Sequence, residues 1–136
     1  MERTLIIVKP DGVRRGLIGE VIGRFEARGL RIAELQLINA QAATVQDHYA
    51  EHRERPFFND VVDYLTSGPI AVVAVEGPNA VKACRSMMGA TNPAEAAGGT
   101  IRGDFALSIE ENVVHGSADP ESAERELKVW FPGEKM

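Results

Sequence analysis

The chain has 136 residues, of which 44% are apolar and 26% are charged, and its formal net charge is −5. These values are ordinary for a globular protein, and we expect one domain over residues 1–136 with a buried core. The acidic balance and the absence of a basic stripe exclude a general nucleic-acid binder, but a few well-placed cations can still hold a small anion such as a nucleotide.

Cysteine content and hydropathy predict where the protein resides. Cys84 is the single cysteine, so no internal disulfide can form, which fits a reducing compartment. No run approaches the ~20 apolar residues needed to cross a bilayer, and residues 1–4 lead into a strand-like run without the layout of a signal peptide. We therefore expect a cytoplasmic protein that has no membrane partner.

The first third of the chain predicts a strand, a helix and a second strand. Residues 4–8 are β-branched or leucine and end at a Pro-Asp-Gly turn, which is typical of a buried strand. Apolar residues at helical spacing predict a helix over residues 18–28 that ends at Gly29. Residues 30–38 predict the second strand, whose alternation slips near Ala33-Glu34 and so indicates a bulge.

The middle of the chain predicts two short helices, a strand and a longer helix. Thr44–Asp47 fits a capping box that opens a short helix through Glu51, and apolar spacing suggests another helix around residues 61–65. Residues 70–75 are nearly all apolar, which is typical of a central strand. Gly77-Pro78 then precedes a helix with apolar residues on one face.

The last third is dominated by a segment with little periodicity, residues 89–111, which we expect to be a long functional loop. Residues 113–114 predict a last short strand. Asp119 is expected to cap a final helix over residues 120–129, with proline at its first position. The alternation of strands and helices along the chain by itself predicts a parallel sheet.

One motif resembles a zinc site. His48-Tyr-Ala-Glu-His52 matches the H-x-x-E-H pattern of inverted zinc peptidases, with both histidines on one helical face. A catalytic zinc also needs a third protein ligand, and such peptidases are usually much larger than this chain. Two exposed histidines on a short polar helix are the better interpretation.

A second motif, Arg102-Gly103-Asp104, matches the adhesive tripeptide of some extracellular ligands. A protein expected in the cytoplasm meets no receptor for such a tripeptide. We therefore expect a tight turn beside a charged pair.

The common nucleotide-binding loops are absent from the sequence: it has neither G-x-x-x-x-G-K-[ST] nor a G-x-G-x-x-G that opens a helix after a strand. Side chains would have to hold phosphates in their place. Taken one at a time, each candidate is more simply a structural or solvated residue. The candidates are Lys9, which ends the first strand, Arg85, Thr91, Arg102 and Asn112, with Phe57 as a stacking surface.

The most suggestive residue is His115, in Asn112-Val-Val-His-Gly-Ser117. Two β-branched residues present the histidine at the end of a short strand, and small residues leave its ring accessible. A neutral imidazole is a nucleophile near neutral pH. From the residues alone, the chain is an α/β domain with a candidate for histidine-dependent phosphate chemistry.

Eight blocks together resemble the nucleoside diphosphate kinase family, and the resemblance covers nearly the whole chain. They occur in the order Arg3–Val13, His48–His52, Arg55–Phe58, Thr66–Pro69, Gly89–Pro93, Gly99–Phe105, Asn112–Ser117 and Glu121–Glu126. The resemblance implies a ferredoxin-like four-stranded antiparallel sheet with surrounding helices, which replaces the expectation of a parallel sheet.

The same resemblance implies an activity. Members of this family move the γ-phosphate of a nucleoside triphosphate, typically ATP, to a nucleoside diphosphate by a ping-pong mechanism through a phosphohistidine. It further implies Mg²⁺ carried by the nucleotide phosphates, broad base specificity, a homotetramer or homohexamer, and no specific nucleic-acid partner. A non-catalytic member of the family and the zinc peptidase are the alternatives.

The resemblance also assigns roles to residues. His115 is the expected nucleophile, phosphorylated on Nδ1, and Glu126, Ser117 and Tyr49 are its supporting residues. The expected nucleotide-binding residues are Lys9, Arg85, Thr91 and Arg102 for the phosphates, with Lys9 and Asn112 for the ribose and Phe57 for the base. Gly98 and Ala118 depart from residues common in the family, proline and an acidic residue, and the glycine is expected to loosen its loop.

Overall fold

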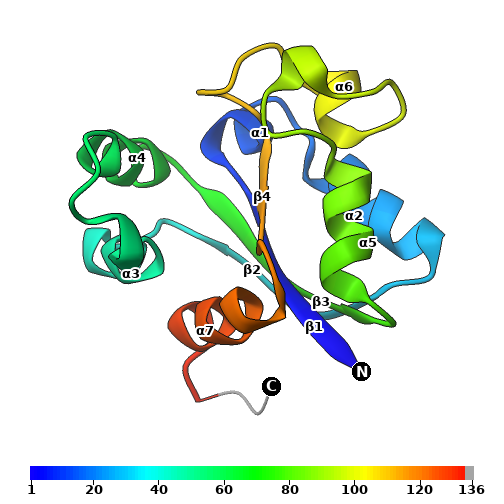
Figure 1. Cartoon of the computed structure of the whole chain (residues 1–136), viewed down its shortest axis with the longest axis horizontal. Coiled ribbons are helices and arrows are strands. Elements are labelled where there is room, and N and C mark those ends of the chain that lie inside the picture. Colours follow the sequence, from blue (N-terminus) through cyan, green and yellow to red (C-terminus); the bar gives the residue numbers. More distant parts are fainter. Residues whose placement is uncertain (134–136) are drawn as a thin grey trace.

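The fold is organised around one four-stranded sheet, seen in the computed structural model, which describes residues 1–133 (Figure 1). The strands stand in the order β2-β3-β1-β4, and every neighbouring pair is antiparallel. The sheet confirms the antiparallel ferredoxin-like fold that the family resemblance implies. The strands are β1 (Glu2–Val8), β2 (Arg31–Ile38), β3 (Ile70–Gly77) and β4 (Val114–Gly116).

The parallel sheet expected from the strand–helix–strand pattern is wrong, and the strand order gives the reason. β1 and β2 do run in the same direction, since each pairs antiparallel with β3. However, β3 lies between them, so the helix that joins them, α2 (Ile18–Arg28), crosses over an intervening strand. A pattern of consecutive elements indicates strand direction but not which later strand is inserted.

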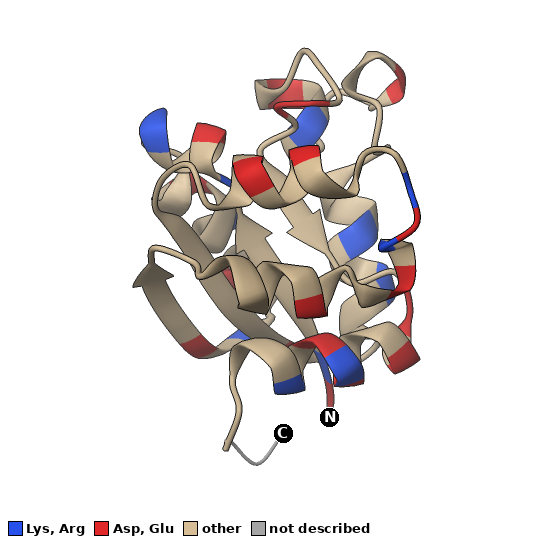
Figure 2. Cartoon of the chain, turned by 90° about the vertical axis from the view of Figure 1, so that its left-hand side faces the viewer, with Lys and Arg blue, Asp and Glu red and all other residues tan. Residues whose placement is uncertain are grey.

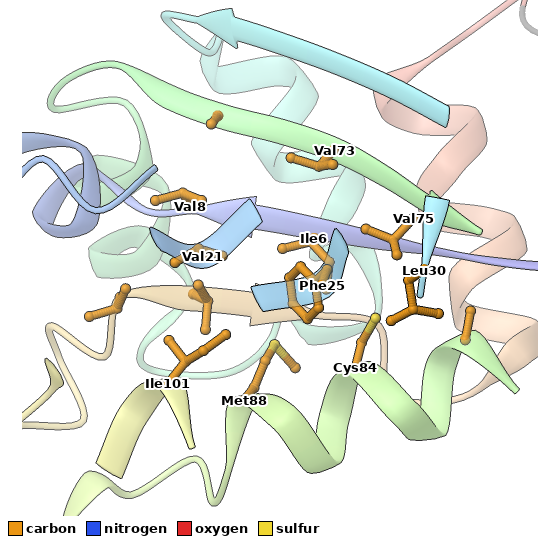
Figure 3. Packing of buried hydrophobic residues seen from close by; sticks show 14 of the residues in the cluster. Ile6, Val8, Val21, Phe25, Leu30, Val73, Val75, Cys84, Met88 and Ile101 are labelled. Atoms are coloured by element: carbon orange, nitrogen blue, oxygen red, sulfur yellow. The ribbon is translucent and has the colours of Figure 1, made fainter. Parts of the chain in front are cut away.

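Helices cover both faces of the sheet, and the alternation of side chains along β1 explains the two cores. Ile6 and Val8 point into one apolar cluster, with helices on that side contributing Phe25, Met88 and further residues (Figure 3). Leu5 and Ile7 point into a second cluster on the opposite face.

The helices divide between these faces (Figure 1). The first face is covered by α2, α5 (Ala80–Met88) and α6 (Ile101–Phe105). The second is covered by α3 (Ala42–His48), α4 (Phe58–Leu65) and α7 (Pro120–Trp130). Acidic and basic residues are interspersed over the helices of this second face (Figure 2). The short helices α1 (Pro10–Arg14), η1 (Ala50–His52) and η2 (Pro93–Glu95) lie in the connections.

Several local expectations are confirmed. α2 ends at Gly29, whose φ of +101° is the left-handed conformation that favours glycine. The bulge in β2 appears as a register shift between Ile32 and Glu34. The Asp119 carboxylate accepts from the backbone N–H of Ser122 at 2.7 Å and caps α7, which begins with Pro120.

Two expectations about where helices and loops begin and end are wrong. The capping box at Thr44 does not form, because α3 begins earlier, at Ala42, and ends at His48. The stretch from 89 to 111 is not a continuous loop, since it contains η2 and α6.

None of the helices in residues 1–133 has the length and apolar content that a bilayer-crossing segment requires.

The tripeptide Arg102-Gly103-Asp104 lies inside α6 rather than in a tight turn. Thr100 caps this helix by accepting from the N–H of Gly103 at 3.0 Å, and a Cβ on Gly103 would come within 1.9 Å of the Ala97 carbonyl oxygen. Asp104 accepts from the N–H of Gly99 at 2.9 Å. The glycine therefore permits a close approach of two backbone segments.

We predict that Gly103→Ala lowers the free energy of unfolding by about 1–3 kcal/mol, because the methyl group meets a backbone carbonyl that has to move. Gly23→Ala is the matched control: Gly23 lies within α2, and a Cβ there would meet no atom of residues 1–133 within 4 Å outside its own helix, so the substitution should raise stability by about 0.5–1 kcal/mol. Urea unfolding at one protein concentration measures both. Equal effects of the two substitutions would contradict the close approach at Gly103.

Candidate active site

A cavity of about 450 Å³ brings together eight of the ten predicted site residues. These eight are Lys9, Tyr49, Arg85, Thr91, Arg102, Asn112, His115 and Glu126. Ser117 does not line the cavity but lies directly behind Glu126, to which it is hydrogen-bonded. Phe57 lies farther out, 45% exposed, with its ring centroid 6.0 Å from that of the cavity-lining His52.

A chain of hydrogen bonds fixes the orientation of His115 on β4. Its Nε2 lies 3.0 Å from Oε1 of Glu126, which α7 supplies. Ser117 Oγ donates to the same Oε1 at 2.9 Å and accepts from the backbone N–H of Leu5 at 3.3 Å. The histidine is thus tied through two side chains to the central strand β1.

The state of Glu126 determines which nitrogen of His115 carries the proton. Burial raises the pKa of the Glu126 carboxyl, but the hydrogen bond and charge of His115, with His48 and Ser117, outweigh it, so the pKa lies below its usual value. A carboxylate only accepts hydrogen bonds, so Nε2 of His115 is the donor. In the neutral imidazole the lone pair available for attack is then on Nδ1.

His48 forms a neutral wall beside His115. It is 2% exposed, and its ring centroid lies 4.6 Å from that of His115 at an interplanar angle of 75°. Trp130 Nε1–H donates to its Nδ1 at 2.8 Å, so the proton of the neutral ring is on Nε2. Burial, and then the neighbouring His115, lower the pKa of His48 to about 3. His48 therefore adds no charge to the site at neutral pH.

The expectation that His48 is exposed is wrong, and sequence reasoning missed its place in the site. The sequence carries a weak signal: Val45 is apolar and lies three residues before His48, and residues three apart share a helical face. In the structure, both residues are buried. Arg125 was also missed. It donates to the carbonyls of Asp47 at 3.2 Å and His48 at 3.0 Å, and so holds α7 against the end of α3.

The structure does not bring His48 and His52 into one metal site. α3 ends at His48, and His52 lies in the separate η1. Within residues 1–133, the His, Cys, Asp and Glu side chains close enough to share a metal ion are those of His48, His115 and Glu126, within 4.8 Å of one another. Since Nε2 of His48 keeps its proton, this ring is not a ligand, and the zinc-peptidase interpretation has no structural support.

The wall of the cavity next to His115 also carries cations, since Arg102 and Arg85 contact the carbonyls of the residues on either side of it. Lys9 Nζ donates to Oδ1 of Asn112 at 2.8 Å, and Asn112 in turn donates to the Thr91 carbonyl at 3.0 Å. Burial, followed by the charge of Arg102, lowers the pKa of Lys9 to about 8. Arg85 donates to the Gly116 carbonyl at 3.4 Å and extends this cationic wall.

Arg102 braces the wall from within α6 rather than from an open loop. Its guanidinium donates to the carbonyls of Gly89 at 2.9 Å and Val114 at 2.7 Å, while its buried Nε has no hydrogen-bond partner among residues 1–133. Burial, and then the nearby Arg85, lower its pKa to about 10. Repulsion among these cations favours the entry of an anion.

Fold and site together define a class: an antiparallel α+β protein with an oriented histidine facing a cationic wall. Comparison with known proteins agrees. Residues 2–136 match the family model described as nucleoside diphosphate kinase. The nucleoside diphosphate kinase of Archaeoglobus fulgidus is 56% identical over 136 residues, which cover 100% of this chain and 90% of that protein. That of Thermus thermophilus is 54% identical over 100% of this chain and 99% of that protein.

Solved structures give the same result. The crystal structure of a nucleoside diphosphate kinase family protein from Babesia bovis superposes with a TM-score of 0.95 at 47% identity, covering 97% of this chain and 89% of that one. The chain belongs to the nucleoside diphosphate kinase family, and it is therefore a nucleotide-binding phosphotransferase.

The lowered pKa of Lys9 predicts a pH dependence of binding. Below about pH 8 the ammonium is charged and attracts phosphate; above it the charge is lost, so the Kd for a nucleoside diphosphate should rise by up to about tenfold per pH unit. Calorimetric titration between pH 7.5 and 9.5 measures this. Lys9→Gln serves as the control, with weaker binding and a flatter profile; a wild-type Kd that is constant over the range would contradict the prediction.

Proposed function

We propose that this chain transfers the γ-phosphate of ATP or another nucleoside triphosphate to a nucleoside diphosphate by a ping-pong mechanism, through a phosphohistidine at His115. The observation that carries the proposal is the hydrogen bond from Nε2 of His115 to Glu126, which leaves Nδ1 as the nucleophile in a pocket with a cationic wall. The arrangement is that of an activated nucleophile oriented by a second group, itself held by a third.

The first half-reaction forms one bond and breaks one. The lone pair of His115 Nδ1 attacks the γ-phosphorus, and the bond from that phosphorus to the bridging oxygen breaks, so the electron pair leaves with the nucleoside diphosphate. In the second half, an oxygen on the terminal phosphate of an acceptor diphosphate attacks the same phosphorus, and the N–P bond breaks to return the lone pair to Nδ1. Glu126 offsets the positive charge that the ring acquires while it is phosphorylated.

The cationic wall supplies most of the remaining stabilisation. Phosphoryl transfer depends mainly on positioning and on offsetting oxygen charge. Lys9, Arg85 and Arg102 provide that charge, and a guanidinium can bind phosphate oxygens in a bidentate manner. Thr91 is a further phosphate contact in this proposal, since it lines the cavity and its carbonyl accepts a hydrogen bond from the Asn112 side chain.

Asn112, Lys9 and Phe57 would recognise the nucleoside in this proposal. Asn112 and Lys9, already hydrogen-bonded to each other, would bind the ribose hydroxyls. Phe57 presents a half-exposed ring on which a base can stack. Stacking tolerates every base because each has a π-face, which supports broad base specificity. Tyr49 packs against His48 and supports the wall beside the nucleophile.

The donor set fits Mg²⁺ that enters with the nucleotide. Mg²⁺ prefers oxygen ligands and is commonly held by substrate phosphates. Glu126 is already engaged by His115 and Ser117, and the wall that would face the phosphates is cationic. In this proposal the nucleotide's own phosphate oxygens hold the ion, which supplies additional positive charge to them.

We further propose that the chain acts in the cytoplasm as a homotetramer or homohexamer. The support is the exposure of large apolar side chains that a second copy would cover. They are Leu35 and Leu37 on the edge strand β2, with Leu107 and Ile109 after α6. At Gly98 a Cβ would meet nothing within 4 Å in the described chain, so the position is open to a side chain or to a neighbouring copy.

Incubation with [γ-³²P]ATP should label the chain at His115, with a bond that is stable in base and labile in acid. His115→Ala should lose both the label and the transfer of phosphate to a second nucleoside diphosphate, because no other group replaces Nδ1. His52→Ala is the matched histidine control and should keep the label. Substantial transfer by His115→Ala, or none by the wild-type chain, would overturn the proposed function.

Arg102→Ala should reduce turnover by roughly 10²–10³-fold, as expected for removal of a group that offsets developing charge. It should also lower the thermal midpoint, since the carbonyls of Gly89 and Val114 lose their donor. Steady-state kinetics and thermal unfolding measure the two effects. Arg102→Lys keeps a charge but not both carbonyl contacts; unchanged turnover in Arg102→Ala would contradict a role in charge stabilisation.

A further inference from the structure

The backbone just before His115 is held in an uncommon conformation. Val113 has a φ of +72°, which β-branched residues rarely adopt, and its side chain is fully buried. The N–H of Val114 donates to the Asn112 carbonyl at 2.8 Å, so residues 112–114 form a γ-turn of the rare form with a positive central φ. The turn begins at Asn112 and ends one residue before His115, and both of these are proposed site residues.

The segment from Lys9 to Gly12 contacts both polar groups of the strained residue. Oδ2 of Asp11 accepts from the N–H of Val113 at 3.0 Å, and the N–H of Lys9 donates to the Val113 carbonyl at 2.8 Å. Gly12 provides the space, since a Cβ there would lie 3.1 Å from the same carbonyl oxygen and 2.8 Å from Val8. The sequence Lys-Pro-Asp-Gly thus forms a clamp on the turn.

Tyr64, from α4 on the other side of the sheet, holds the central residue of this clamp. Its hydroxyl donates to Oδ1 of Asp11 and accepts from the Asp11 N–H at 3.1 Å. Asp11 is 1% exposed, and each of its carboxylate oxygens has one of these partners. A buried carboxylate satisfied in this way has a single orientation. The described contacts give neither Asp11 nor Tyr64 a place in the lining of the cavity.

We propose that Asp11 and Tyr64 are positioning residues, which hold the Val113 γ-turn and thereby set the rate at which His115 is phosphorylated. The inference rests on the proposed function. It assigns a purpose to the strain: the turn at Val113 connects Asn112 to His115, which pairs with Ile7, and the Val113 carbonyl accepts from the N–H of Lys9. A small displacement of a reacting group reduces the rate steeply.

The experiment compares single-turnover phosphorylation by ATP in wild type, Asp11→Asn and Tyr64→Phe, each normalised to folded protein. Asp11→Asn replaces one acceptor by a donor and should slow phosphorylation by about 10–100-fold. Tyr64→Phe leaves the carboxylate in place and should slow it by a smaller factor, and it keeps the test available where Asp11→Asn folds poorly. Glu2→Gln is the matched control, since Glu2 also accepts from a distant backbone N–H, that of Val81, at 2.8 Å, and it should phosphorylate at the wild-type rate.

Val113→Gly tests whether the clamp acts by holding a strained backbone. Glycine adopts a positive φ without steric cost, so the turn then depends less on Asp11. Adding Asp11→Asn in this background should slow phosphorylation by less than about threefold. If Asp11→Asn slows phosphorylation in the Val113→Gly background by as large a factor as in the wild-type chain, the strain explanation is overturned. A wild-type phosphorylation rate for both Asp11→Asn and Tyr64→Phe would overturn the proposal.

Amide hydrogen exchange gives a readout that needs no nucleotide. The N–H of Val113 should exchange faster in Asp11→Asn than in Glu2→Gln, because its buried acceptor is weakened. A purely structural Asp11 would lower global stability without this local change or the slower chemistry. If wild type fails to become phosphorylated, the proposed function fails, while exchange at Val113 still decides whether Asp11 holds the turn.

Discussion

The hydrogen bond between Glu126 and His115 is the interaction on which the site depends, because it selects the tautomer of the histidine. Its two partners come from α7 and β4, so the bond forms only when the last helix packs on the sheet. Ser117 links the same carboxylate to the backbone of Leu5, so these side chains are fixed to the central strand β1. Since β1 pairs with both β3 and β4, the apolar cores on either face of the sheet determine where Nδ1 stands.

The charge of each group in the cavity has a structural cause. His48 is neutral because burial lowers its pKa and Trp130 fixes its proton, so the charge in direct contact with His115 is that of the Glu126 carboxylate. Lys9 and Arg102 remain cationic near neutral pH although burial lowers the pKa of each. An anionic phosphate is therefore attracted toward His115, because Arg102 and Arg85 contact the carbonyls of Val114 and Gly116 on either side of it. In the proposed reaction, these cations would offset the charge of the substrate where His115 attacks.

The sequence predicts features that depend on neighbouring residues better than features that depend on residues far apart in the chain. The end of α2 at Gly29, the cap at Asp119 and the bulge at Glu34 were predictable because each depends on neighbouring residues. The insertion of β3, the contact of His48 with Trp130 and the hydrogen bond that holds Val113 involve residues 63 to 102 positions apart, which no local pattern contains. The site was predicted as a set only through family resemblance; residue by residue, each member had a simpler structural interpretation.

The features that shape the site also lower the stability of the empty protein. The cations of the cavity repel one another, Arg102 Nε finds no hydrogen-bond partner in the described part of the chain, and Val113 occupies a sparsely populated conformation. These costs persist because the surrounding fold over-determines the geometry: the clamp from Lys9 to Gly12 and the two cores leave the turn no alternative. A polyanion that enters relieves the repulsion and favours protonated Lys9, so it gains binding free energy that a neutral molecule of the same shape does not. Selectivity for phosphates thus arises from the same unfavourable terms that the fold has to offset.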